Sequence, residues 1–68
     1  MEHWKRPDGR YFYADVQSDL FGLVVVIAHG GRTPPRVHSI PVNRIEEADR
    51  VIERIGRRRA AHGYRREG

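Results

Sequence analysis

The turn Gly30-Gly31-Arg32 carries the residue types best suited to bind an anion in this sequence. Glycine adopts positive φ without strain, and consecutive backbone N–H groups in such a turn form a concavity that holds phosphate or carboxylate. The guanidinium of Arg32 would add the matching charge. A structural interpretation also stands, because a turn that ends a strand needs glycine as well. The residue types leave both interpretations open.

Further arginines extend this candidate surface. Arg36 follows the turn on a segment that alternates like a strand, where it either continues the cationic surface or guards an exposed strand edge against aggregation. Residues 57–66 contain five arginines and no acidic residue. Arginine at a helix C-terminus also stabilises the helix dipole, which gives this cluster a structural explanation. The predicted nucleic-acid-binding residues are Gly30, Gly31, Arg32, Arg36, Arg57, Arg58 and Arg65.

The composition agrees with an anionic partner. The 68 residues carry a formal net charge of +4, and twelve of the thirteen basic residues are arginine. Planar guanidinium suits forked contacts with phosphate, so this bias is compatible with nucleic acid. Codon usage in a GC-rich genome is the alternative explanation. A chain of this length forms one domain with a small core.

Several functional classes lack their sequence signatures. The chain has no cysteine, and its four histidines are not spaced as a metal pair, so we expect no disulfide and no metal site. No nucleophile elbow, Walker phosphate loop or H-E-x-x-H motif is present. We therefore expect no enzyme, no catalytic residue, no cofactor and no small-molecule substrate. The chain also lacks a signal peptide and an apolar run of about 20 residues, so we expect a cytoplasmic protein that does not enter a membrane.

Alternating and β-branched segments predict three strands. In residues 10–17 apolar side chains alternate with Tyr11 and Tyr13. The tyrosine side is either a platform on which bases stack or ordinary strand surface that packs on a neighbour. Residues 23–28 are a continuous apolar run, which predicts a central strand covered on both faces. Residues 36–40 form the third predicted strand.

Two segments are predicted to lie outside the sheet. Residues 1–9 have no periodicity and contain a Pro-Asp-Gly turn signal, so we expect a flexible tail. Trp4 within it is expected to tuck against the domain edge. For residues 19–22 we expect a short helical turn that plugs one end of the core, because Leu20 and Phe21 disfavour the positive φ of a two-residue hairpin.

One amphipathic helix closes the chain. Asn43 followed by Glu46 matches a capping box. Gly56 costs about 1 kcal/mol within a helix and marks either a weak point or a close approach to the sheet. Gly63 is expected to end the helix, and Tyr64 to fold back onto the sheet. The apolar positions with helical spacing are Ile45, Ala48, Val51, Ile52 and Ile55.

Taken in order, these pieces resemble the WGR domain, a small module of stand-alone bacterial proteins and of poly(ADP-ribose) polymerases. The matching residues are Tyr11-Phe12-Tyr13, Val16-Gln17, Asp19-Leu20-Phe21-Gly22, Gly31-Arg32, Arg36-Val37, Ile45-Glu46-Glu47-Ala48 and Gly63-Tyr64-Arg65. The resemblance covers residues 10–66 and is greatest to the bacterial stand-alone branch. It implies an α+β fold in which a small twisted antiparallel sheet of three to four strands carries one C-terminal helix across one face. A fourth strand would come from residues 1–9 or from division of the second run.

The sequence departs from the WGR pattern in two places. The tryptophan position falls on Gly30, and the loop Thr33-Pro34-Pro35 is shorter than the family's glycine-bearing loop. In the polymerases the resemblance implies DNA-end binding, with the tryptophan on the terminal nucleotide; Arg32 keeps the arginine's position, but the ring is missing. We therefore expect a bacterial module that binds DNA or another nucleic acid through its backbone. The alternative is a protein-interaction or self-assembly module, hence a homo-oligomer, without DNA binding.

Overall fold

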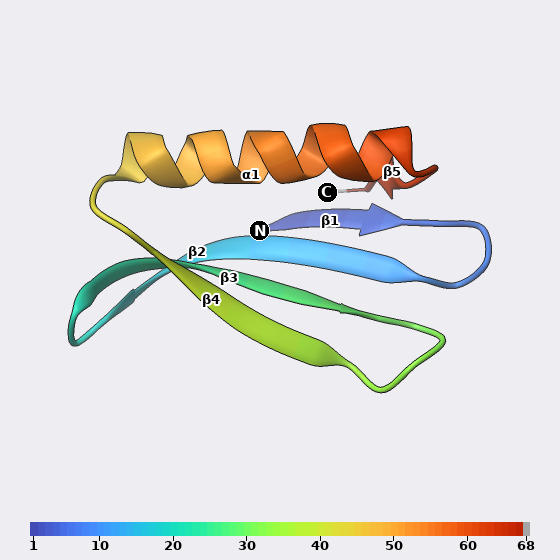
Figure 1. Cartoon of the computed structure of the whole chain (residues 1–68), viewed down its shortest axis with the longest axis horizontal. Helices are drawn as coiled ribbons and strands as arrows, with labels where there is room; N and C mark the ends of the chain where they lie inside the picture. Colours follow the sequence, from blue (N-terminus) through green and yellow to red (C-terminus); the bar gives the residue numbers. More distant parts are fainter. Residues whose placement is uncertain (68) are drawn as a thin grey trace.

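A computed structural model describes residues 1–67 and contains a five-stranded sheet with one helix across it (Figure 1). The elements are β1 (Glu2–Lys5), β2 (Tyr11–Asp19), β3 (Gly22–Gly30), β4 (Arg36–Val42), α1 (Ile45–Ala61) and β5 (Arg65–Arg66). The sheet order is β4-β3-β2-β1-β5, and every neighbouring pair is antiparallel. The predicted α+β fold with a C-terminal helix is confirmed. The sheet is wider than expected because both ends of the chain contribute a strand.

The N-terminal segment forms a strand, so the predicted tail is wrong for residues 2–5. β1 pairs with β2, where Trp4 lies opposite Phe12, and with β5 on its other side. Trp4 is only 3% exposed and belongs to the hydrophobic core. A Cβ on Gly56 would lie 3.2 Å from the Trp4 ring, so this glycine of α1 marks a close approach to the sheet. Burial of the indole gives a short segment enough apolar contact to order it.

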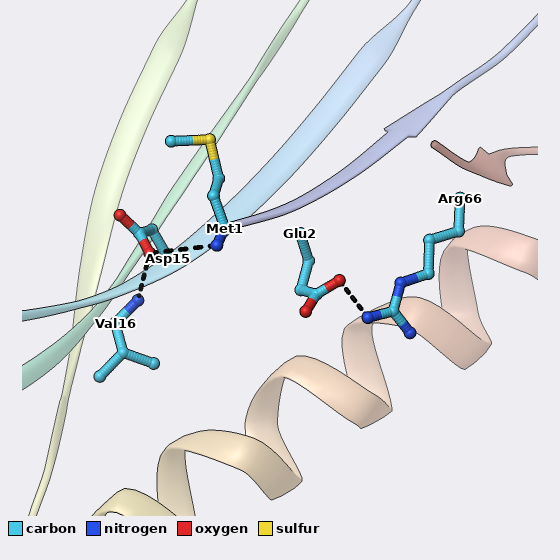
Figure 2. A network of polar contacts seen from close by, with 5 residues as sticks. All are labelled: Met1, Glu2, Asp15, Val16 and Arg66. Atoms are coloured by element: carbon cyan, nitrogen blue, oxygen red, sulfur yellow. Dashed lines mark hydrogen bonds and ion pairs between the residues drawn. The ribbon is translucent and has the colours of Figure 1, made fainter. Parts of the chain in front are cut away.

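Polar contacts also join β1 to its neighbours (Figure 2). The Met1 ammonium lies 3.7 Å from the Asp15 carboxylate, which accepts a 3.0 Å hydrogen bond from the Val16 N–H. The Glu2 carboxylate accepts a hydrogen bond from the Arg66 guanidinium and pairs β1 with β5. Exposed ion pairs of this kind contribute about 0–1 kcal/mol, so apolar packing anchors β1 more strongly than these contacts do.

The core lies between α1 and one face of the sheet. Its buried residues are Trp4, Ala14, Val25, Ile27, Val42 and Ala48. On β3 the intervening side chains, Val24 and Val26, point to the opposite face and are only half-buried. β3 is an internal strand, between β2 and β4, but the prediction that it is covered on both faces is wrong. The single helix covers one face, and no other element of residues 1–67 covers the second (Figure 1).

The β2–β3 connection is a two-residue hairpin, which contradicts the predicted helical turn and core plug. Asp19 pairs directly with Gly22 across the hairpin. Gly22 supplies the positive φ, at 129°, and the Asp19 carboxylate accepts a 2.7 Å hydrogen bond from the Phe21 N–H. Leu20 and Phe21 therefore avoid positive φ. Each is 96% exposed at the tip, far from the core.

The helix begins one residue later than the capping box predicts. Arg44 occupies the N-cap and makes no side-chain capping bond, so Asn43 is not the N-cap. The Asn43 N–H instead donates to the Glu47 carboxylate at 3.0 Å, because the shift brings Glu47 rather than Glu46 to the position that reaches back. Acidic residues fill the first turn, and Arg58 and Arg59 lie in the last, as the helix dipole favours.

The meander places alternate connections at opposite ends of the molecule. The β1–β2 turn, the β3–β4 loop and the C-terminus of α1 share one end, whereas the β2–β3 hairpin lies at the other (Figure 1). Because β1 is a strand, residues 6–10 turn beside residues 31–35. The candidate site is built from this arrangement.

Candidate nucleic-acid interface

Arginines from three separate segments gather at one end of the molecule. Two come from the β1–β2 turn, two from the β3–β4 loop and the start of β4, and two from the last turn of α1. We call this region the cationic end and define it by Arg6, Arg10, Arg32, Arg36, Arg58 and Arg59. In residues 1–67, Arg32, Arg36 and Arg58 make no ion pair with a carboxylate.

Glycine at two consecutive positions allows the β3–β4 loop to pack on its neighbours. Gly31 has a φ of 112°, and a Cβ there would overlap the Gly9 carbonyl oxygen and lie 2.8 Å from the Arg10 Cα. Gly30 does not have positive φ; a Cβ on it would lie 2.9 Å from the Tyr11 hydroxyl. Of the two, only Gly31 is therefore needed for backbone conformation, whereas a Cβ on Gly30 would displace the end of the Tyr11 side chain.

A hollow of about 230 Å³ lies where these turns meet. It is lined by Arg10, Tyr11, His29, Gly30, Arg32, Thr33 and Tyr64. This volume is below the roughly 300–1,000 Å³ typical of small-molecule sites. Two guanidinium groups and three rings around a shallow opening suit a phosphate group with part of its sugar or base.

Arg59 is held by aromatic rings at the inner side of the cationic end. Its guanidinium carbon lies 4.6 Å from the Phe12 ring centroid and 5.6 Å from that of Tyr64. Phe12 in turn stacks on His29, with centroids 5.5 Å apart. The Arg59 Nε is buried and has no hydrogen-bond partner within residues 1–67. Arg59 therefore acts mainly in packing. Its cation–π contacts hold the rings of Phe12 and Tyr64 in place, and Tyr64 lines the hollow.

A carboxylate, Asp8, lies within the cationic end. It accepts a 3.1 Å hydrogen bond from the Arg10 N–H and lies 3.5 Å from the Arg10 guanidinium and 3.7 Å from that of Arg6. The hydrogen bond from the Arg10 backbone and the charges of Arg6, Arg10 and Arg32 lower the pKa of Asp8, against a smaller opposing effect of desolvation. Asp8 thus stays ionised at neutral pH and offsets part of the positive charge.

The predicted residues of the β3–β4 region come together as expected. Gly30 and Arg32 line the hollow, and Gly31 packs the loop on the neighbouring turn. Arg36 lies opposite His29 in the β3–β4 register, beside the hollow, and is exposed. Arg58 is exposed in the last helical turn at the same end.

The other two predicted arginines lie apart from this group. Arg57 is on the flank of α1 that faces β1 and lies 3.6 Å from the Glu53 carboxylate. It lines a separate groove of about 480 Å³ beside Trp4. Arg65 is in β5, opposite Lys5, toward the helix-free face of the sheet. The predicted C-terminal cluster is therefore divided by the fold.

Sequence patterns did not assign Arg10 and Tyr64 to the site, nor Tyr11 to the hollow. All three depend on β1, which turns the chain back so that residues 6–10 face the β3–β4 loop. The Pro-Asp-Gly signal was visible, and taken together with Trp4 it would have indicated a hairpin rather than a tail.

A row of arginines on α1 extends the cationic end. Arg50, Arg54 and Arg58 are four residues apart and share one helical face, and none makes an ion pair within residues 1–67. The groove lining places Glu53 and Arg57 toward β1, so this row lies on the flank of α1 away from β1.

Compared with protein-family models, curated proteins and solved structures, the chain matches none. Across residues 1–67, α1 falls short of the length and apolar character of a membrane-crossing helix. The same residues contain no cluster of three or more side chains suited to hold a metal ion.

Proposed function

We propose that this chain is a non-enzymatic, WGR-like module of a bacterial, cytoplasmic protein that binds nucleic acid, chiefly the DNA backbone, through its cationic end. The observation that carries this proposal is the packing of Gly31 against the β1–β2 turn, which sets Arg32 beside Arg10 around one shallow hollow. The guanidinium groups of Arg36 and Arg58, which make no ion pair with the carboxylates of residues 1–67, continue the same surface.

The chemistry of the cationic end favours phosphate over base edges. Guanidinium groups form forked hydrogen bonds to phosphate oxygens, and the row of Arg50, Arg54 and Arg58 offers further charges along α1. Such contacts position a nucleic acid without reading its sequence. We expect affinities of about 10⁻⁴–10⁻⁶ M at physiological salt, which is typical of backbone binding.

The absence of the WGR tryptophan has a physical counterpart in this fold. A Cβ at position 30 would lie 2.9 Å from the Tyr11 hydroxyl and 3.2 Å from the Pro35 Cα, so a side chain there would displace the end of the Tyr11 side chain. Tyr11 and Tyr64 line the hollow with Arg32, so under this proposal their rings supply the contact with sugar or base that Gly30 lacks.

The salt dependence of DNA binding tests the proposal. For Arg32→Ala we expect weaker binding to a labelled duplex and a log–log salt slope about 1 unit shallower, because one phosphate contact is lost. Arg57→Ala is the matched control, since it removes the same charge from the flank of α1 that faces β1, outside the cationic end. Fluorescence anisotropy over a salt series measures both. Equal effects of the two substitutions, or no duplex binding at low salt, would contradict the proposal.

Neutralising the internal carboxylate should strengthen binding. Asp8→Asn keeps an oxygen that accepts from the Arg10 N–H but frees the charges of Arg6 and Arg10, so we expect about 2- to 5-fold tighter duplex binding at low salt. Asp19→Asn makes the same change of net charge at the opposite hairpin and should leave the affinity nearly unchanged. An equal gain in both variants would mean that only net charge matters, without a site.

One observation favours the alternative function, a protein-interaction module. β4 is an edge strand, and its Val37 is 65% exposed. An unpaired edge can add a strand from a second chain, although Arg36 and Pro41 on the same strand oppose this. Sedimentation velocity at two concentrations distinguishes the two functions, because self-assembly through β4 would give a concentration-dependent dimer.

A further inference from the structure

The face of the sheet that α1 does not cover carries a cluster of aromatic and basic side chains at its cationic end. Strand alternation sends Trp4 and Phe12 toward α1, and it sends the neighbouring residues of β1 and β2 to the opposite side. We call this cluster the tyrosine face and define it by His3, Lys5, Tyr11, Tyr13 and Arg65.

The rings of the tyrosine face pack against one another, which holds them in place. Tyr11 and Tyr13 lie nearly parallel, with ring centroids 5.9 Å apart and planes 12° apart. His3 lies opposite Tyr13 in the β1–β2 register and meets it edge to face at 5.8 Å. All three side chains are only half-buried, so the rings are held in place and remain accessible from solvent.

Positive charge flanks these rings. Lys5 lies opposite Tyr11 on one side and opposite Arg65 on the other, so two cations in neighbouring strands flank the Tyr11 ring. Lys5 has a distant partner in Glu67, at 3.9 Å, whereas Arg65 makes no ion pair within residues 1–67. Tyr11 also lines the hollow with Arg10 and Arg32, so the tyrosine face continues into the cationic end.

We infer that the tyrosine face binds unpaired bases of single-stranded nucleic acid. Bases stack on aromatic rings regardless of sequence, and nearby cations bind the phosphates that join them. In a duplex the base faces are already stacked on each other, so only an unpaired strand uses these rings. This inference rests on the proposed nucleic-acid function and adds the class of strand and a second contact surface.

The distribution of side chains favours this occupant over a protein. Val24 and Val26 of the same face pair with Gln17 and Asp15 and so lie farther along the strands toward the β2–β3 hairpin, whereas Ala28 and the exposed Val37 lie in the row of Tyr13, on β3 and β4. The cations thus lie on the β1 and β5 side of the rings, and the aliphatic residues lie on the β3 and β4 side and toward the hairpin. A protein partner that buried an apolar surface would use the aliphatic half instead.

Replacing one ring tests the inference. Tyr13→Leu keeps an apolar side chain over the sheet but removes the aromatic face, and Tyr13 does not line the hollow. We expect binding of fluorescein-labelled oligothymidine of about 10 nucleotides to weaken by about 5- to 150-fold, while binding of a duplex stays unchanged. Tyr13→Phe should keep the wild-type affinity. Phe21→Leu, the same kind of change at the far hairpin tip, is the control and should have no effect.

The outcomes separate this inference from the proposed function. Suppose that Arg32→Ala weakens binding of both the oligothymidine and the duplex, while Tyr13→Leu changes the affinity for neither. Then the tyrosine face is not a base-binding surface, and the proposed function survives. If the wild-type chain is a dimer that Tyr13→Leu dissociates, the face is a protein interface and the inference is wrong. Should Tyr13→Leu fail to fold, an NMR titration of the wild type decides: stacked bases shift the ring protons of His3, Tyr11 and Tyr13, and no shift there contradicts the inference.

Discussion

Trp4→Ala is expected to lower the free energy of unfolding by about 3–5 kcal/mol. The indole is 3% exposed, packs edge to face on Phe12 at 6.3 Å, and fills the space that Gly56 leaves in α1. A chain of 68 residues has a free energy of unfolding of roughly 3–10 kcal/mol, so the substitution should remove most of it. Because residues 6–10 depend on β1 for their position, the cationic end should be lost together with the fold.

Urea denaturation followed by circular dichroism measures this effect. Trp4→Phe is the matched control, since it keeps a ring against Gly56 and should cost clearly less than the alanine variant. If Trp4→Ala unfolds at the same urea concentration as the wild type, β1 contributes nothing to the core and the five-stranded sheet is incorrect. Emission from the single tryptophan of the wild type should shift to the red on unfolding, as the buried indole meets water.

Gly31→Ala is expected to separate the two turns that form the site. The new Cβ would overlap the Gly9 carbonyl and press on the Arg10 Cα, in a backbone with a φ of 112°. Strain and overpacking together should cost about 2–5 kcal/mol. Duplex affinity should fall in the protein that still folds, because Arg32 no longer lies beside Arg10.

Gly22→Ala distinguishes collision from backbone strain. Gly22 also has positive φ, at 129°, but a Cβ there would meet nothing within 4 Å, and it lies at the opposite hairpin. We expect this variant to lose less stability and to keep its affinity for DNA. Thermal unfolding and anisotropy measure the two properties separately. Equal losses in both variants would show that the packing of Gly31 on the β1–β2 turn is not what assembles the site.

The elements with a strong period were predictable from the sequence. The helical stripe of Ala48, Val51 and Ile55 and the alternation of β2 report burial on one side, which is a local property. β1 was not predictable in this way. Four residues with one tryptophan show no period, and their order comes from a distant partner, Gly56, which only the folded chain brings close.

Two further predictions from the sequence were wrong for the same physical reason: a local pattern does not show in which direction a side chain points. Leu20 and Phe21 were expected to plug the core because they are apolar, but Gly22 takes the positive φ of the hairpin and leaves both side chains exposed. The arginines of residues 57–59 were treated as one cluster. Consecutive helical residues diverge by about 100°, so Arg57 faces β1 while Arg59 packs on Phe12.

Arg32 was the part of the candidate site that the sequence indicated directly, because the glycines before it mark a turn whatever the topology. Arg10 and Tyr64 became visible only when the order of strands was known, since they reach the hollow from other segments. Whether this hollow binds phosphate stays a prediction until the salt series is measured.

The length of the β2–β3 hairpin sets a fixed distance between its tip and the cationic end. Its strands have nine residues each, so the tip carrying Leu20 and Phe21 lies about 30 Å from the cationic end. Both tip side chains are almost fully exposed, so a dye attached to a Leu20→Cys variant should leave the fold intact. Energy transfer from such a dye to one on either terminus of an oligonucleotide would then report the direction in which the strand lies.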